Sequence, residues 1–97
     1  MKCNKSILIK GKIRNESFMF SSMQRAIKAG LTGFVKVKFN GDVRIEAEGD
    51  EKIVNDFIDW CKRGTVWSDV NNVIVETGEL KNFEKFAIKK AAIFPIF

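Results

Sequence analysis

Residues 30–49 read GLTGFVKVKFNGDVRIEAEG, and this stretch decides the fold. Residues 35–39 alternate between apolar and cationic side chains, which is the two-residue period of a strand with one buried face. Residues 43–48 alternate in the same way, with charged side chains between apolar ones. Between the two runs stands Asn40–Gly41, a pair that tolerates positive φ at both positions and is a strong signal for a hairpin turn. The stretch therefore predicts two antiparallel strands joined by a tight turn.

The flanking segments alternate between strand and helix periodicity. From the N-terminus we expect a strand over 6–14, a helix over 18–29, strands over 32–39 and from 43 onward, a helix over 50–63, and strands over 70–77 and 83–89. Gly30 is placed to end the first helix in a left-handed cap. This order, β-α-β-β-α-β with a terminal addition, predicts a ferredoxin-like α+β sandwich in which two helices cover one face of an antiparallel sheet.

The same periods predict which side chains each face carries. The expected buried stripes are Phe20, Met23, Ala26 and Ile27 in the first helix, and Ile53, Val54, Phe57, Trp60 and Cys61 in the second. The inward residues of the last two strands are expected to be Val73, Val75, Phe86 and Ile88. The opposite face of the sheet is polar enough to stay open to solvent. It would carry Lys10, Lys12, Phe34, Lys36, Lys38, Arg44, Glu46 and Glu48.

The composition fits one small folded domain. The chain has 97 residues, of which 45% are hydrophobic and 30% charged, and this is too apolar for a disordered chain. We expect residues 1–97 to form a single domain with its core in 6–89, and the apolar tail AAIFPIF, residues 91–97, to pack rather than float. No run is long and apolar enough to span a membrane, and the N-terminal residues lack a signal-peptide stretch, so the sequence predicts a cytoplasmic protein without membrane contact.

The residue types that are missing exclude several chemistries. The sequence has no histidine, and its two cysteines, Cys3 and Cys61, are not at a metal-binding spacing. This excludes a histidine general base, Cys-His and Ser-His nucleophile pairs and His-ligated zinc, and we expect neither a metal nor a cofactor. The net charge of +5 favours an anionic partner, although a solubilising surface charge also accounts for it.

Several short motifs together resemble the acylphosphatase family over residues 6–89. GLTGFV at 30–35 is similar to the family's GLTGWV, and VRIEAEG at 43–49 to the end of its G-x-V-x-x-x-A-E-G. FIDWCKRG at 57–64 is similar to F-x-x-W-x-x-x-G. The resemblance implies the family's fold and its activity, which is metal-free hydrolysis of the carboxyl-phosphate bond of acyl phosphates.

The resemblance also implies where the catalytic parts should lie. In the family, a loop of pattern G-x-V-Q-G-V-x-F-R wraps the phosphate in backbone N–H groups at a helix N-terminus. Its arginine clamps the phosphate, and an asparagine on the following strand orients the attacking water. Residues 11–19 of this chain read GKIRNESFM, so Met19 stands where the arginine should be, and Val37 falls at the asparagine position.

The remaining loop positions are also changed. Arg14 replaces the family's Gln, Asn15 its second Gly and Glu16 its second Val, whereas Phe18 is retained. Asn15 can adopt the left-handed conformation of the lost glycine, but the Glu16 carboxylate would repel a phosphate. Ser17 fits an N-cap or first-turn residue and has no base beside it to make it a nucleophile.

Three functional hypotheses follow. The first is an acylphosphatase-like domain whose hydrolysis is lost or very weak, leaving an anion-binding or interaction role; its ligand would be a small anion or acyl phosphate, and no protein partner is indicated. The second is an active enzyme with a rearranged site that uses Arg14 or a nearby lysine. The third, ranked last, is single-stranded RNA binding on the cationic sheet face around Phe34, where GFVK at 33–36 matches part of an RNA-recognition signature.

Overall fold

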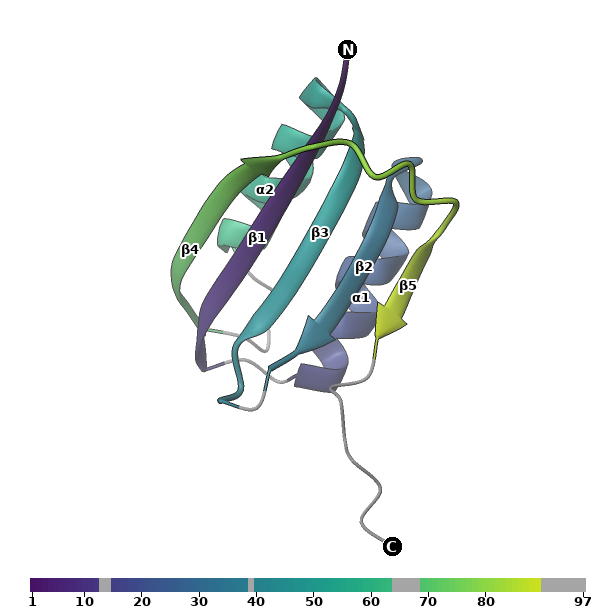
Figure 1. The fold of residues 1–97 in the computed structure, drawn as a ribbon. Coiled ribbons are helices and arrows are strands. Elements are labelled where there is room, and N and C mark those ends of the chain that lie inside the picture. Colours follow the sequence, from purple (N-terminus) through teal and green to yellow (C-terminus); the bar gives the residue numbers. More distant parts are fainter. Residues whose placement is uncertain (13–14, 39, 64–68, 90–97) are drawn as a thin grey trace, which may run out of the picture.

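The computed structural model of the chain describes residues 1–12, 15–38, 40–63 and 69–89. The elements in chain order are β1 (Lys2–Lys12), α1 (Asn15–Lys28), β2 (Thr32–Val37), β3 (Val43–Asp50), α2 (Glu51–Arg63), β4 (Asp69–Gly78) and β5 (Phe86–Lys89). The strands form one sheet in the order β4-β1-β3-β2-β5 (Figure 1). The expected packing of residues 91–97 lies outside the described residues.

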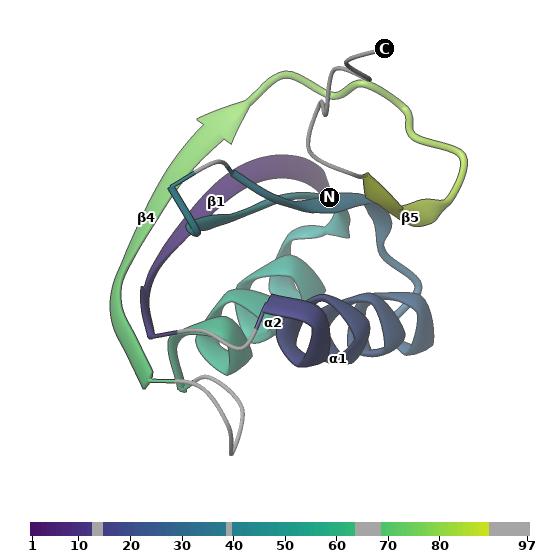
Figure 2. The same cartoon turned by 90° about the horizontal axis from the view of Figure 1, so that it is seen from below.

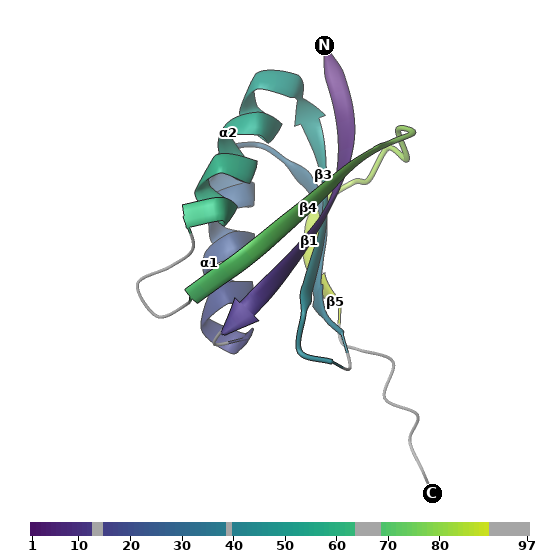
Figure 3. The same cartoon turned by 90° about the vertical axis from the view of Figure 1, so that its left-hand side faces the viewer.

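The two helices lie on one face of the sheet, so the molecule has two layers (Figure 3). This is the ferredoxin-like α+β fold that the element order predicts. The sheet is mixed rather than wholly antiparallel, because β5 pairs with β2 in parallel while the other three pairings are antiparallel. The parallel pairing arises because the chain leaves β4 at one edge of the sheet and crosses to the other edge before β5 begins (Figure 1).

The β2–β3 hairpin forms where it was expected, but its turn is longer than two residues. The last paired residues are Val37 and Val43. The Lys38 carbonyl accepts from the Gly41 N–H at 2.9 Å, and the Lys38 N–H donates to the Asp42 carbonyl at 2.7 Å. Only Gly41 has a positive φ, +90°, whereas Asn40 instead uses its side-chain oxygen to accept from the Asp42 N–H. The dipeptide therefore marks the turn without occupying its two central positions.

The core lies between the sheet and the helices. Its fully buried members come from all layers: Ile7, Ile9, Phe18, Ala26, Val35, Val43, Ile45, Ala47, Val54 and Cys61. At about 25 cal/mol per Å² of apolar surface removed from water, burial of this set is the main favourable term for folding.

Helix α1 buries only part of the expected face: Ala26 is fully buried and Met23 packs against the core, as predicted. The helix begins at Asn15, and the row that faces the sheet is Phe18, Ser22 and Ala26, spaced four residues apart. The Ser22 hydroxyl can lie in this row because it donates to the Met19 carbonyl at 3.0 Å. The prediction that Phe20 and Ile27 are buried is wrong: their exposed fractions are 55% and 54%.

Smaller corrections concern α2 and β4. In α2, Ile58 is buried in place of the expected Ile53, which is exposed. On β4, Val73 packs against the core, but Val75 is exposed although its neighbour Ile7 on β1 is fully buried. β4 is an edge strand that curves past the side of the helix layer (Figure 2). The helices therefore cover its side chains only in part.

The sheet face opposite the helices is partly covered, contrary to expectation. Residues 79–85, which connect β4 to β5, cross this face (Figures 1 and 2). Under this crossover, Glu46 and Glu48 are only 1% and 2% exposed, and Phe34 is 6% exposed. The three residues were expected on a solvated face, because strand alternation cannot show that a distant segment folds over them.

Hydrogen bonds satisfy the two buried carboxylates. The Asn4 amide nitrogen bridges them, donating to Glu46 at 3.1 Å and to Glu48 at 3.0 Å. Glu48 also accepts the backbone N–H of Lys81 at 2.6 Å and of Phe83 at 3.1 Å. Glu46 forms ion pairs with the Lys81 ammonium at 2.7 Å and the Arg44 guanidinium at 3.4 Å. β1, β3 and the crossover thus share one polar network, which also explains why β1 starts at Lys2 rather than at Ser6.

Both carboxylates stay ionised in this network. Burial alone would raise the pKa of Glu46, but the hydrogen bonds from Lys81 and Asn4 hold it below the usual range. The pKa of Glu48 is lowered as well, since the backbone N–H of Lys81, the Asn4 amide and the backbone N–H of Phe83 outweigh its desolvation. The crossover is therefore held by charge-assisted hydrogen bonds, which are stronger than neutral ones.

Two positions of the GLTG stretch require glycine, for different structural reasons. Gly30, at φ +78°, ends α1 in a Schellman motif: its N–H donates to the Ile27 carbonyl at 3.0 Å, and the Leu31 N–H donates to the Ala26 carbonyl at 2.9 Å. Gly33, at φ +136°, lies so close to β3 that an added Cβ would be 1.8 Å from the Glu46 carbonyl oxygen. The first glycine is needed for its dihedral angle, and the second for the lack of a side chain as well.

Alanine substitutions should separate these two roles. Gly30→Ala should reduce the free energy of unfolding by about 1–2 kcal/mol, because the space around it is open and only the left-handed conformation is penalised. Gly33→Ala should cost more than about 4 kcal/mol, since the backbone of β2 or β3 must move. Urea unfolding followed by circular dichroism measures both, and equal losses for the two variants would contradict this account.

The buried carboxylates should make stability depend on pH. Their native pKa values lie below those of the unfolded chain, so their contribution is present at neutral pH and is lost as the pH falls below about 5. Glu48→Gln should lower the free energy of unfolding at pH 7 by about 2–4 kcal/mol and flatten the decline below pH 5. Glu84→Gln, an exposed carboxylate on the same crossover, is the matched control. An unchanged pH profile in Glu48→Gln would show that the network does not control the transition.

Candidate active site

The candidate site lies where β1 passes into α1. β1 ends at Lys12 and α1 begins at Asn15, so the connection is short. The first backbone N–H groups of α1 have no partner within the helix, and the helix dipole places positive charge at this end. Arg14, expected as a substitute clamp, lies outside the described residues, and for Asn15 and Glu16 only the backbone is described. The helix start, with its partial positive charge, therefore lies directly after the end of β1.

Phe18 anchors this helix start. Its side chain is fully buried, and its ring centroid lies 5.7 Å from that of Trp60 on α2. Trp60 in turn stacks on Phe57 at 5.9 Å with an interplanar angle of 22°. Ser17, in the first turn of α1, is exposed. Three aromatic rings therefore hold the first turns of α1 against α2, independently of any charged group.

Met19 and Val37 occupy apolar surroundings. Both are half-buried and pack against the core. Met19 is in the second turn of α1, and Val37 is the last residue of β2, paired with the fully buried Val43. A thioether cannot pair with an anion, and an isopropyl group cannot donate to or accept from water. Neither side chain can perform the polar step that the family resemblance implies for its position.

The two cysteines have raised pKa values. Cys61 is fully buried, and burial raises its pKa well above that of a free thiol. Burial also raises the pKa of Cys3. Over residues 1–12, 15–38, 40–63 and 69–89 there is no group of three or more acidic, cysteine or histidine side chains placed to hold a metal ion. Both thiols are therefore protonated at neutral pH.

The aromatic side chain that the RNA hypothesis needs is covered. The Phe34 ring meets Phe83 edge-on at 5.9 Å between centroids. The Lys89 ammonium lies 4.2 Å from the Phe34 ring centroid, and the Arg44 guanidinium lies 5.7 Å from it. A ring enclosed by an aromatic and two cations has no free face on which a base could stack.

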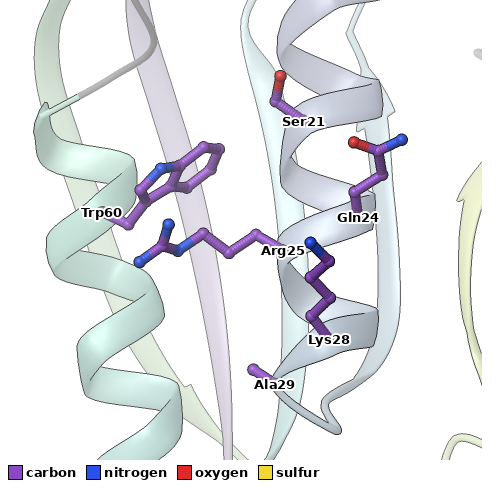
Figure 4. Close-up of a pocket in the computed structure, with 6 residues that line it drawn as sticks. All are labelled: Ser21, Gln24, Arg25, Lys28, Ala29 and Trp60. Carbon is purple, nitrogen blue, oxygen red and sulfur yellow. The ribbon is translucent and has the colours of Figure 1, made fainter.

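Sequence reasoning missed two groups that only the folded chain assembles. One is the Asn4 bridge between the buried carboxylates. The other is a groove between α1 and α2 that contains Arg25 and Trp60 (Figure 4). The sequence shows cations at positions 25 and 28 of the first helix, but it does not show that Trp60 of the second helix lies beside Arg25.

The fold and the strand–connection–helix site define the class of protein, and comparison with known proteins identifies the family. A model of the acylphosphatase family matches residues 5–88. The acylphosphatase of Moorella thermoacetica is 32% identical over 84 residues, 87% of this chain and 90% of that protein. The crystal structure of the Bacillus subtilis acylphosphatase has a TM-score of 0.85 at 29% identity, covering 92% of this chain and 99% of that one. The acylphosphatase structure from Coxiella burnetii has a TM-score of 0.86 at 25% identity, covering 91% and 93%. The chain belongs to the acylphosphatase family.

In the described part of the chain, neither helix is long and apolar enough to cross a membrane.

The packing of Val37 leads to a prediction about stability. Val37→Asn should lower the free energy of unfolding by about 1–3 kcal/mol, because it places an amide against the apolar core. Lys36→Asn, one residue earlier on the opposite face of β2, should change it by less than about 0.5 kcal/mol. Urea titrations of the two variants provide the comparison, and an equal effect would mean that Val37 does not contribute to the core.

Proposed function

We propose that this member of the acylphosphatase family hydrolyses acyl phosphates weakly or not at all, and that its β1–α1 connection retains an anion-binding role. The observation that carries the proposal is the packing of Met19 and Val37 against the core, at the positions where the family resemblance places the catalytic arginine and asparagine. Apolar side chains fit these surroundings, because both positions pack against the hydrophobic core.

The expected loss of rate is large. Removing a phosphate-clamping arginine costs on the order of 10³-fold or more in other phosphoryl-transfer systems. Removing one positioned hydrogen-bond donor costs about 10²- to 10³-fold. The helix start alone supplies backbone N–H groups and a partial positive charge, which suffice for weak anion binding but not for orienting water.

Restoring the two side chains is the direct test. Wild-type protein should hydrolyse benzoyl phosphate at a rate close to spontaneous hydrolysis, and Met19→Arg with Val37→Asn should recover part of the family's rate. The double variant should gain more than the sum of the single gains in free energy, because clamp and water act on one transition state. A folding check by circular dichroism precedes the assay, since Val37→Asn is destabilising. Rapid turnover by the wild-type protein would refute the proposal.

The rearranged-site hypothesis is the second candidate, and one variant separates it from the first. If Arg14 serves as the clamp, wild-type turnover should be substantial and should fall about 10³-fold in Arg14→Ala. Lys62→Ala removes a cation from the exposed side of α2 and serves as the control. Weak turnover that Arg14→Ala leaves unchanged supports the proposal of lost hydrolysis.

A further inference from the structure

A groove separates the outer sides of α1 and α2. Its volume is about 450 Å³, and it is lined by Ser21, Gln24, Arg25, Lys28 and Ala29 of α1 and Trp60 of α2 (Figure 4). Arg25 is ten residues after Asn15, which is about 15 Å along the helix at 1.5 Å per residue. The Arg25 part of the groove is therefore about 15 Å from the start of α1, whereas Ser21 lines the groove about 9 Å from it.

An aromatic contact positions the main cation of the groove. The Arg25 side chain extends from α1 to α2, with its guanidinium carbon 5.4 Å from the Trp60 ring centroid (Figure 4). Trp60 is itself held by the rings of Phe18 and Phe57. A guanidinium fixed against an indole loses less freedom when it binds a ligand than a free side chain would.

The groove has an excess of positive charge and of hydrogen-bond donors. Lys28 adds an ammonium one turn after Arg25, and among the described residues no carboxylate lines the groove. In the part of the chain that the structure describes, the ion pairs involve Met1, Arg44 and Lys81, and none involves Arg25 or Lys28. Gln24 and Ser21 contribute an amide and a hydroxyl. The combination is complementary to an anion that also carries hydroxyl groups.

We infer that this groove binds a phosphomonoester with a planar ring, of the nucleoside monophosphate type. The ring stacks on the side of the Arg25 guanidinium that faces away from Trp60, because guanidinium planes stack on aromatic rings and bases. The Lys28 ammonium pairs with the phosphate, and the Gln24 amide and Ser21 hydroxyl bind the sugar. Because Gln24, Arg25 and Lys28 are exposed to solvent, affinity is in the range of about 0.1–10 mM.

Nuclear magnetic resonance of the full ¹⁵N-labelled chain tests this inference with AMP as the probe. AMP should shift the Trp60 indole N–H signal and the amides of residues 21–29 in a saturable way, and a Trp67→Phe variant assigns the indole signal. Ribose 5-phosphate, which lacks the ring, and adenosine, which lacks the phosphate, should each bind about tenfold more weakly. Shifts confined to residues 11–19, equal affinity for ribose 5-phosphate, or no saturation by about 10 mM would overturn the inference.

Charge variants distinguish specific binding of AMP in the groove from non-specific attraction of AMP to a basic protein. Lys28→Gln and Arg25→Gln should each weaken AMP binding about tenfold. Lys62→Gln removes the same charge from an exposed position of α2 outside the groove and should leave the affinity within about twofold. An equal loss of AMP affinity in Lys62→Gln and Lys28→Gln would contradict the proposal of a specific site. Because the readout is binding at residues 21–29, the outcome does not depend on hydrolysis or on Met19 and Val37.

Discussion

The burial of two negative charges under the crossover is the constraint on which the rest of the structure depends. A carboxylate removed from water is stable only if charged or hydrogen-bonding partners replace the water. For Glu46 and Glu48 these partners are the Asn4 amide, the Lys81 ammonium and backbone N–H groups of residues 81 and 83. The network fixes the register of β1 on β3 and holds the crossover that carries the chain to the far edge of the sheet. That path in turn allows β5 to pair with β2 in parallel and places Phe83 over Phe34.

The two faces of the sheet are therefore stabilised by different kinds of interaction. On the helix side, burial of apolar surface dominates, and it includes the stack that Phe18, Trp60 and Phe57 form at the start of α1. On the other side, stabilisation comes from hydrogen bonds to ionised groups and varies with pH. The candidate site belongs to the helix side. The start of α1 is held there by aromatic packing rather than by charged groups.

Under the proposed function, this separation explains how the scaffold can persist with Met19 and Val37 at the positions where the family resemblance places the catalytic pair. Polar side chains poised for catalysis are often unfavourable for stability, because they place charges or amides where apolar groups would pack better. A methionine and a valine at these positions extend the core instead. The same helix that presents the candidate site at its start presents cations at its other end, where Arg25 rests on Trp60. The two proposed anion sites would thus lie near opposite ends of α1, without a phosphate clamp.

The sequence by itself determined the element order, the hairpin at residues 40–41 and the cap at Gly30, because each depends on residues close together in the chain. It also carried the motifs that resemble the acylphosphatase family, and the family comparison confirmed them. Only the tertiary structure decided that Phe20 and Ile27 of α1 face solvent, since the rotation of a helix is set by what it packs against. In the same way, Glu46 and Glu48 alternate with apolar residues as a solvated face would, and they are buried because residues 79–85, more than thirty positions later, fold over them. Periodicity records which side of a strand a residue occupies, whereas a contact between distant segments determines whether that side meets water.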